Sequence, residues 1–133
     1  GSSAKALATM EIHLLATAEA EAYSYANKAD WEARVSYNLL PAGQLRRRIE
    51  SLALDAWRAL GCRDAGRIDV RLDENGLPGF IEVNPLAGIH PVISDLPMMA
   101  TKIGVSYLEL IGTIMDSALQ RCGLTERAQS MAA

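Results

Sequence analysis

The residues best suited to chemistry lie in two short alternating runs that flank the turn sequence Asp73-Glu74-Asn75-Gly76. Residues two apart on a strand point to the same face, so the pattern predicts a hairpin over 66–84 with one apolar and one polar face. The apolar face comprises Ile68, Val70 and Leu72 opposite Ile81 and Val83, and the polar face comprises Arg67, Asp69 and Arg71 opposite Glu82 and Asn84.

The polar face of this hairpin predicts a metal site. A four-residue turn over 74–77 would place Asp69 directly opposite Glu82, with Cβ atoms about 5 Å apart. Two carboxylates in that position repel unless a cation lies between them, and Asn84 adds a neutral oxygen. Such hard oxygen ligands suit Mg²⁺ with nucleotide phosphates, whereas zinc prefers His or Cys, which this face lacks. Arg67 would neutralise a transferred phosphoryl group or a developing oxyanion.

The same charges have a simpler interpretation as a ladder of cross-strand salt bridges on a solvated face. The segment that follows favours a site. Residues 85–97 are too apolar for a solvated loop, and they lead into a helix N-terminus. Free backbone N–H groups and a Ser hydroxyl there can hold a carboxylate or a phosphate.

Hydrophobic spacing predicts the elements that must position these residues. Short strands are expected at 11–15 and 35–39, with another β-leaning run at 21–26. Helices are expected over 44–60, 96–103 and 107–122. The first helix should bury the stripe Leu45, Ile49, Leu52, Ala56 and Leu60, and the last the stripe Leu108, Ile111, Met115, Ala118 and Cys122.

The sequence also predicts how the last helix begins and to which fold class the chain belongs. Ser106 and Glu109 have the spacing of a capping box. The pattern as a whole predicts an α+β fold: a mainly antiparallel sheet with the helices at 44–60 and 107–122 packed on one face.

Composition limits the class of protein. The chain has 133 residues, half of them hydrophobic, with a net charge of −3. This suits one folded domain and excludes a disordered segment, and it predicts neither a nucleic-acid nor a membrane partner. Two distant cysteines are typical of a reduced, cytoplasmic protein. We interpret 1–3 as an expression scar, 4–123 as the folded unit and 124–133 as a flexible tail.

Several strings in order resemble the C-terminal part of D-alanine–D-alanine ligases, which belong to the ATP-grasp superfamily of carboxylate–amine ligases. The resemblance runs from about Tyr23 to Gly123 and implies the fold of a C-terminal ATP-grasp subdomain. The strings are Gly61-Cys62-Arg63, Gly66-Arg67-Ile68-Asp69-Val70-Arg71-Leu72-Asp73, Phe80-Ile81-Glu82-Val83-Asn84-Pro85 and the loop at Gly88.

The resemblance also implies a mechanism. ATP phosphorylates a carboxylate to an acyl phosphate, and an amine then attacks it to give an amide, ADP and phosphate. The cofactors implied are ATP and Mg²⁺, with Mn²⁺ as an alternative metal. The implied roles are metal binding by Asp69, Glu82 and Asn84, stabilisation of the phosphoryl and tetrahedral states by Arg67, phosphate contact by Lys28, and binding of the second substrate's carboxylate at Gly88 and Ser94.

The chain departs from the family in two places. The loop after Gly88 reads Ile89-His90-Pro91-Val92-Ile93, with one residue more before Ser94. This leaves open a second substrate other than D-alanine, with His90 either contacting it or merely packing in the loop. Residues 4–40 hold no glycine-rich phosphate loop, and no substrate domain fits ahead of them.

We therefore expect a C-terminal fragment that has no ligase activity alone and meets ATP and small amino-acid substrates through missing N-terminal parts. An isolated half would expose apolar surface, which makes a homodimer one expected assembly. Two other hypotheses are a non-catalytic binding or oligomerisation module that reuses the fold, and a ligase for a different amino acid or peptide.

Overall fold

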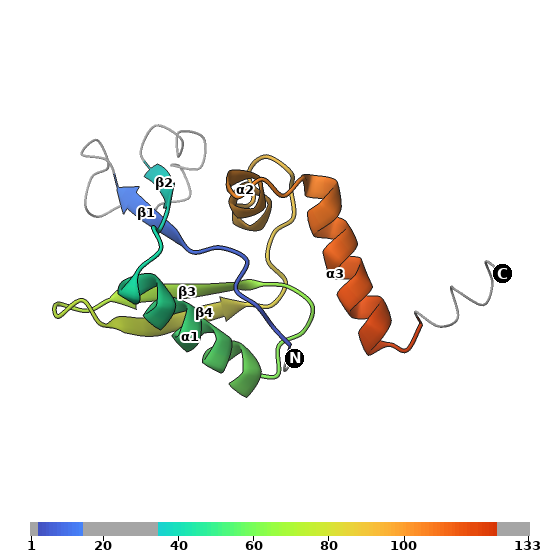
Figure 1. The fold of residues 1–133 in the computed structure, drawn as a ribbon, viewed down its shortest axis with the longest axis horizontal. Coiled ribbons are helices and arrows are strands. Elements are labelled where there is room, and N and C mark those ends of the chain that lie inside the picture. Colours follow the sequence, from blue (N-terminus) through green and yellow to red (C-terminus); the bar gives the residue numbers. More distant parts are fainter. Residues whose placement is uncertain (1–2, 15–34, 125–133) are drawn as a thin grey trace, which may run out of the picture.

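The computed structural model describes residues 3–14 and 35–124 (Figure 1). The predicted run at 21–26 and Lys28 lie outside these residues. The α+β class is confirmed. The elements in order are β1 (Met10–Leu14), β2 (Val35–Leu39), α1 (Gln44–Ala59), β3 (Arg67–Leu72), β4 (Pro78–Asn84), α2 (Asp95–Lys102) and α3 (Tyr107–Arg121).

The described strands form two separate antiparallel pairs, β1 with β2 and β3 with β4. At the open end of the β1–β2 pair, one hydrogen bond joins the two chain segments and another links them to α1. The Leu40 backbone N–H donates to the Thr9 carbonyl at 2.9 Å, and the Thr9 hydroxyl donates to Glu50 on α1 at 3.2 Å. The described sheet that carries the predicted chemistry is therefore the β3–β4 hairpin alone.

The β3–β4 hairpin keeps the predicted pairing at its open end and departs from it nearer the turn. Asp69 lies opposite Glu82, as predicted. Beyond this pair the register shifts, so Val70 lies opposite Phe80 and Ile81 has no partner across the ladder. The expectation that Ile81 joins the apolar face opposite β3 is wrong: it forms a bulge and is 58% exposed.

The chemistry of the turn accounts for this shift. The Asp73 carboxylate accepts hydrogen bonds from the N–H groups of Asn75 and Leu77 at 2.9 and 2.7 Å, and Gly76 has a positive φ of 73°. The Asp73 N–H donates to the Leu77 carbonyl at 2.9 Å, so these two residues pair and the loop is one residue shorter than predicted. The extra residue at Ile81 compensates and restores the predicted pairing further along.

Helix α1 packs on the hairpin, as Figure 1 shows. Its buried residue is Trp57, whose ring fills the space beside Gly66 and the end of β4. Leu60, predicted to continue the buried stripe, is instead 56% exposed. The other predicted stripe residues are half-buried, namely Leu45, Ile49, Leu52 and Ala56.

Helices α2 and α3 build a second packed region. Its buried centre is Leu96 and Ala100 from α2 and Leu110 from α3. Helix α3 departs from the place expected beside α1: it packs against α2 and extends away from the hairpin (Figure 1). The partly buried residues around this centre are Ala65, Ala87, Val105 and Ile114.

The face that α3 buries agrees only in part with the predicted one, because Ile111 and Ala118 of the predicted stripe are half-buried. Leu108 and Met115 of the predicted stripe are 81% and 53% exposed, whereas Leu110 is buried and Ile114 half-buried. The predicted capping box is confirmed, because Ser106 and Glu109 each bond the other's backbone N–H.

No helix in the described ranges is long and apolar enough to cross a membrane.

Candidate functional site

The polar face of the hairpin brings the predicted metal ligands together. Asp69 and Glu82 are direct partners across the ladder. Asn84 lies two residues beyond Glu82 on the same strand, and its amide donates to Glu82 Oε1 at 2.9 Å. Because the amide nitrogen is turned toward Glu82, the carbonyl oxygen of Asn84 stays available as a ligand.

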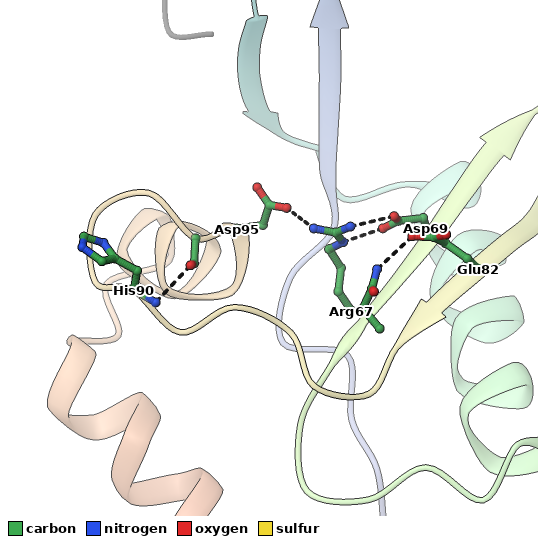
Figure 2. Close-up of polar contacts among 7 residues, drawn as sticks. Arg67, Asp69, Glu82, His90 and Asp95 are labelled. Carbon is green, nitrogen blue, oxygen red and sulfur yellow. Dashed lines mark hydrogen bonds and ion pairs between the residues drawn. The ribbon is translucent and has the colours of Figure 1, made fainter. Parts of the chain in front are cut away.

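Arg67 lies beside this group and is held from two sides (Figure 2). Its Nε and Nη2 donate to the two oxygens of Asp69 at 2.7 and 2.9 Å. Its Nη1 donates to Asp95 at the start of α2. The hydrogen bonding of Arg67 to Asp69 is the main cause that raises the pKa of Arg67 above its usual value, and the nearby charge of Asp95 adds to it.

This arrangement is not the cross-strand ladder of salt bridges that the sequence left open. Arg67 pairs with Asp69 along its own strand, and Arg71 lies opposite Gly79, which offers no side-chain charge. Within the described residues no ion pair joins β3 to β4. Among the residues that the structure describes, Glu82 has no ion-pair partner, which leaves its charge for another ligand.

The loop between β4 and α2 places Gly88 against Ser94. A Cβ on Gly88 would lie 2.7 Å from Ser94 Oγ. That hydroxyl accepts a hydrogen bond from the His90 N–H at 3.0 Å, as Figure 2 shows. Ser94 also precedes the first residue of α2, where the first backbone N–H groups of the helix have no partner within it, although the Ser94 side chain does not cap them.

His90 has a local role in this loop. Its Nδ1 accepts from the N–H groups of Val92 and Ile93 at 3.3 and 3.4 Å. His90 is exposed, and these local contacts leave both alternatives for it, substrate contact and packing in the loop, as predictions.

A small open pocket of about 210 Å³ lies between the hairpin and the loop, and it is lined by Arg67, Ala87, Gly88, Ile93, Ser94, Asp95 and Leu96. The predicted substrate residues Gly88 and Ser94 thus share a pocket with the predicted catalytic residue Arg67. Asp95 is the one lining residue with charge that sequence reasoning missed. The sequence does place Asp95 in the first turn of the helix after the loop, but nothing in the sequence shows that this turn faces β3.

The donor set fits Mg²⁺. The described residues hold no cluster of three or more His, Cys, Asp or Glu side chains arranged around a metal. Two carboxylates and one amide oxygen suit a cation that keeps water and phosphate oxygens in its other positions. Asp69 accepts from Arg67 at both oxygens, yet each carboxylate oxygen has a second lone pair free for a metal.

The fold and this hairpin resemble the C-terminal part of ATP-grasp ligases of known structure. The family described as "D-ala D-ala ligase C-terminus" matches residues 3–116. The chain belongs to this family.

Curated relatives and solved structures agree with the assignment. The chain is 40% identical over 83 residues to a D-alanine--D-alanine ligase of Synechococcus sp. (strain JA-3-3Ab). The aligned residues make up 62% of this chain and 25% of that protein. With the D-alanine--D-alanine ligase of Cupriavidus taiwanensis it shares 32% identity over 123 residues, covering 89% and 35%.

The D-alanine--D-alanine ligase of Bacillus anthracis has a similar structure, with a TM-score of 0.64 and 28% identity over 84% of this chain and 34% of that one. The same enzyme complexed with ATP matches with a TM-score of 0.59 over 64% of this chain and 30% of that one. The chain therefore spans between a quarter and about a third of the length of these relatives.

Proposed function

We propose that this chain supplies the metal- and phosphate-binding wall of an ATP-dependent ligase that joins the carboxylate of one small amino acid to the amine of another. The observation that carries the proposal is the polar face of the hairpin, where Asp69 faces Glu82 with Asn84 alongside and Arg67 next to them. The names of the relatives support a ligase, and the ATP complex of one solved relative supports ATP as the co-substrate.

Asp69, Glu82 and Asn84 would hold Mg²⁺, which when bound neutralises the phosphate oxygens of ATP. Arg67 contributes a fixed positive charge beside these ligands. Its guanidinium remains charged at any working pH, so it stabilises negative charge on a transferred phosphoryl group or a tetrahedral intermediate without a proton transfer.

The loop and the start of α2 would hold the carboxylate of the second substrate. The Ser94 hydroxyl accepts from His90, which leaves its own hydrogen free to donate to that carboxylate. Free backbone N–H groups at the start of α2 add to the attraction for an anion. Lys28, proposed to contact phosphate, lies outside the described residues.

One observation favours a second substrate other than D-alanine. The charged Asp95 lines the pocket with Gly88 and Ser94, and the loop that leads to it is one residue longer than the family pattern. Screening the native gene product for ADP release with a panel of amino acids tests this. Highest kcat/KM with D-alanine would refute the different substrate and leave the ligase proposal intact.

The ligase proposal is tested by phosphate release from ATP in the native gene product. Glu82→Gln should lower the rate by at least about tenfold, because it removes a ligand charge, whereas Glu74→Gln in the exposed turn should not. The 133-residue chain alone should release no phosphate from ATP and D-alanine beyond its own Glu82→Ala variant. An unaffected Glu82→Gln enzyme would overturn the proposal.

A further inference from the structure

Arg67 is the point at which the hairpin meets α2. One edge of the guanidinium, formed by Nε and Nη2, donates to both oxygens of Asp69. The remaining nitrogen, Nη1, is bound to Asp95, which lies 28 residues along the chain. In the described ranges this is the one side-chain polar contact between β3–β4 and α2.

The partners are sheltered enough for the contact to matter. The side chains of Arg67, Asp69 and Asp95 are 34%, 35% and 25% exposed, less than the surface pair of Arg58 with Asp55, at 43% and 71%. A charge-assisted bond in such a place is stronger than one on an open surface. The bond between Arg67 and Asp95 also lies next to the loop, because Asp95 directly follows Ser94 in the sequence.

We propose that Asp95 is a positioning residue for Arg67: it fixes the orientation of the guanidinium beside the metal-ligand face and links it to the loop that carries Gly88 and Ser94. This inference rests on the proposed function for the role of Arg67. The bonds to Asp69 alone hold the guanidinium from one side only. The bond from Nη1 to Asp95 holds it from the opposite side, so the plane cannot turn without breaking contacts at both ends.

The arrangement has a consequence for the reaction. Ser94 and Asp95 are consecutive, so a second substrate bound at Ser94 would lie next to the residue that holds Arg67. The position of the phosphoryl-stabilising charge and the position of the second substrate are therefore set by one segment, the start of α2. The loss of Asp95 should affect kcat more than the KM for ATP.

Side-chain NMR of the 133-residue chain tests the contact itself. The readout is the rate of rotation about the Nε–Cζ bond of Arg67, which bonds at both ends of the guanidinium slow down. Asp95→Ala should speed this rotation by at least about threefold, because one charge-assisted bond is lost. Asp95→Glu should restore much of the slow rotation, and Asp55→Ala, which breaks the exposed pair with Arg58, should leave Arg67 unchanged.

Asp95→Asn, which keeps the shape and removes the charge, serves as a second variant should Asp95→Ala fail to fold. It should speed the rotation by a smaller factor than Asp95→Ala. An Arg67 rotation rate unchanged in the folded Asp95 variants would overturn the proposal.

Kinetics of the native gene product test the functional part. Asp95→Asn should lower kcat, counted per folded enzyme, by about tenfold while the KM for ATP stays within about twofold, and Asp95→Glu should recover much of the loss. Equal kcat values would overturn the positioning role. A fully active Glu82→Gln enzyme would instead overturn the proposed function, and the hold of Asp95 on Arg67 would then stand on the NMR result alone.

Discussion

Gly66 is the residue at which packing and the proposed site meet. A Cβ there would lie 2.6 Å from the backbone carbonyl oxygen of Asn84 and 2.7 Å from the Trp57 ring. Neither neighbour can move freely, since one is backbone and the other a buried ring. Gly66→Ala should therefore destabilise the fold by about 1–3 kcal/mol, measured by urea unfolding, and should displace the strand end that carries Asn84.

Gly112→Ala is the matched control for this substitution. Gly112 lies within α3, and a Cβ there meets no atom within 4 Å. The change should stabilise the chain by up to about 1 kcal/mol, because alanine is the better helix former. Equal free energies of unfolding for Gly66→Ala and the parent chain would contradict the packing described around Trp57.

At the residue scale the sequence foretold the grouping of Asp69, Glu82 and Asn84, because these residues are fixed by local alternation and one short turn. It did not foretell the contact of Arg67 with Asp95. That contact depends on how α2 packs through Ala87 and Ala65, and a tertiary packing of this kind leaves no periodic signal in the sequence.

At the scale of elements, the capping box of α3 gives a direct prediction. The Ser106 hydroxyl accepts from the Glu109 N–H at 3.3 Å, and the Glu109 carboxylate accepts from the Ser106 N–H at 2.8 Å. Ser106→Ala should cost about 1 kcal/mol of unfolding free energy, because a helix N–H loses its partner.

The matched control is Ser51→Ala in the middle of α1. Ser51 is exposed and lies in the helix interior, where alanine is the better residue, so this change should be neutral or slightly stabilising. A Ser106→Ala chain as stable as Ser51→Ala in thermal unfolding would show that the box does not stabilise α3.

The helices and the hairpin were predicted almost to their ends, whereas faces and register near the turn were less predictable. α3 carries apolar residues on two sides, and hydrophobic spacing does not tell which side α2 covers. The structure buries Leu110 and leaves Leu108 exposed. In the hairpin, the side chain of Asp73 shortened the loop by one residue, and a bulge at Ile81 absorbed the difference.

At the scale of the whole molecule, the Asp64–Arg121 ion pair fastens the end of α3 to the segment before β3, with Nη2 and Oδ2 2.7 Å apart. The hydrogen bond from Arg121 is the main cause that lowers the pKa of Asp64 below its usual value. The bonds from Ser106 lower the pKa of Glu109 likewise. Lowered values mean that both groups stabilise the fold above their unfolded pKa values.

This stabilisation should be lost in acid, as the pH falls below the ordinary carboxyl range and through the lowered folded pKa values. Asparagine, like aspartate, tolerates the positive φ of 59° at this position, so Asp64→Asn removes the charge without straining the backbone. Its urea midpoint should be lower than that of the parent chain at neutral pH, and the two should converge in acid. Parallel curves across the whole range would contradict the assigned role of the pair.

The chain matches only one part of its relatives, and it leaves apolar residues of α3 exposed. Its fold class and family agree with the sequence-based expectation, while it spans only a quarter to about a third of its relatives. Leu108 and Met115 of α3 are exposed, and no described residue covers them fully. The expected homodimer stays a prediction.

The central claim is that one face of the β3–β4 hairpin binds a divalent cation together with ATP. Broadening of backbone amide NMR signals by Mn²⁺, measured on the 133-residue chain with ATP, tests it most directly. The account predicts broadening centred on Asp69, Glu82 and Asn84, with an apparent Kd that rises at least about tenfold in Glu82→Gln and stays unchanged in Glu74→Gln. Equal Mn²⁺ affinity in the parent chain and in Glu82→Gln would contradict it.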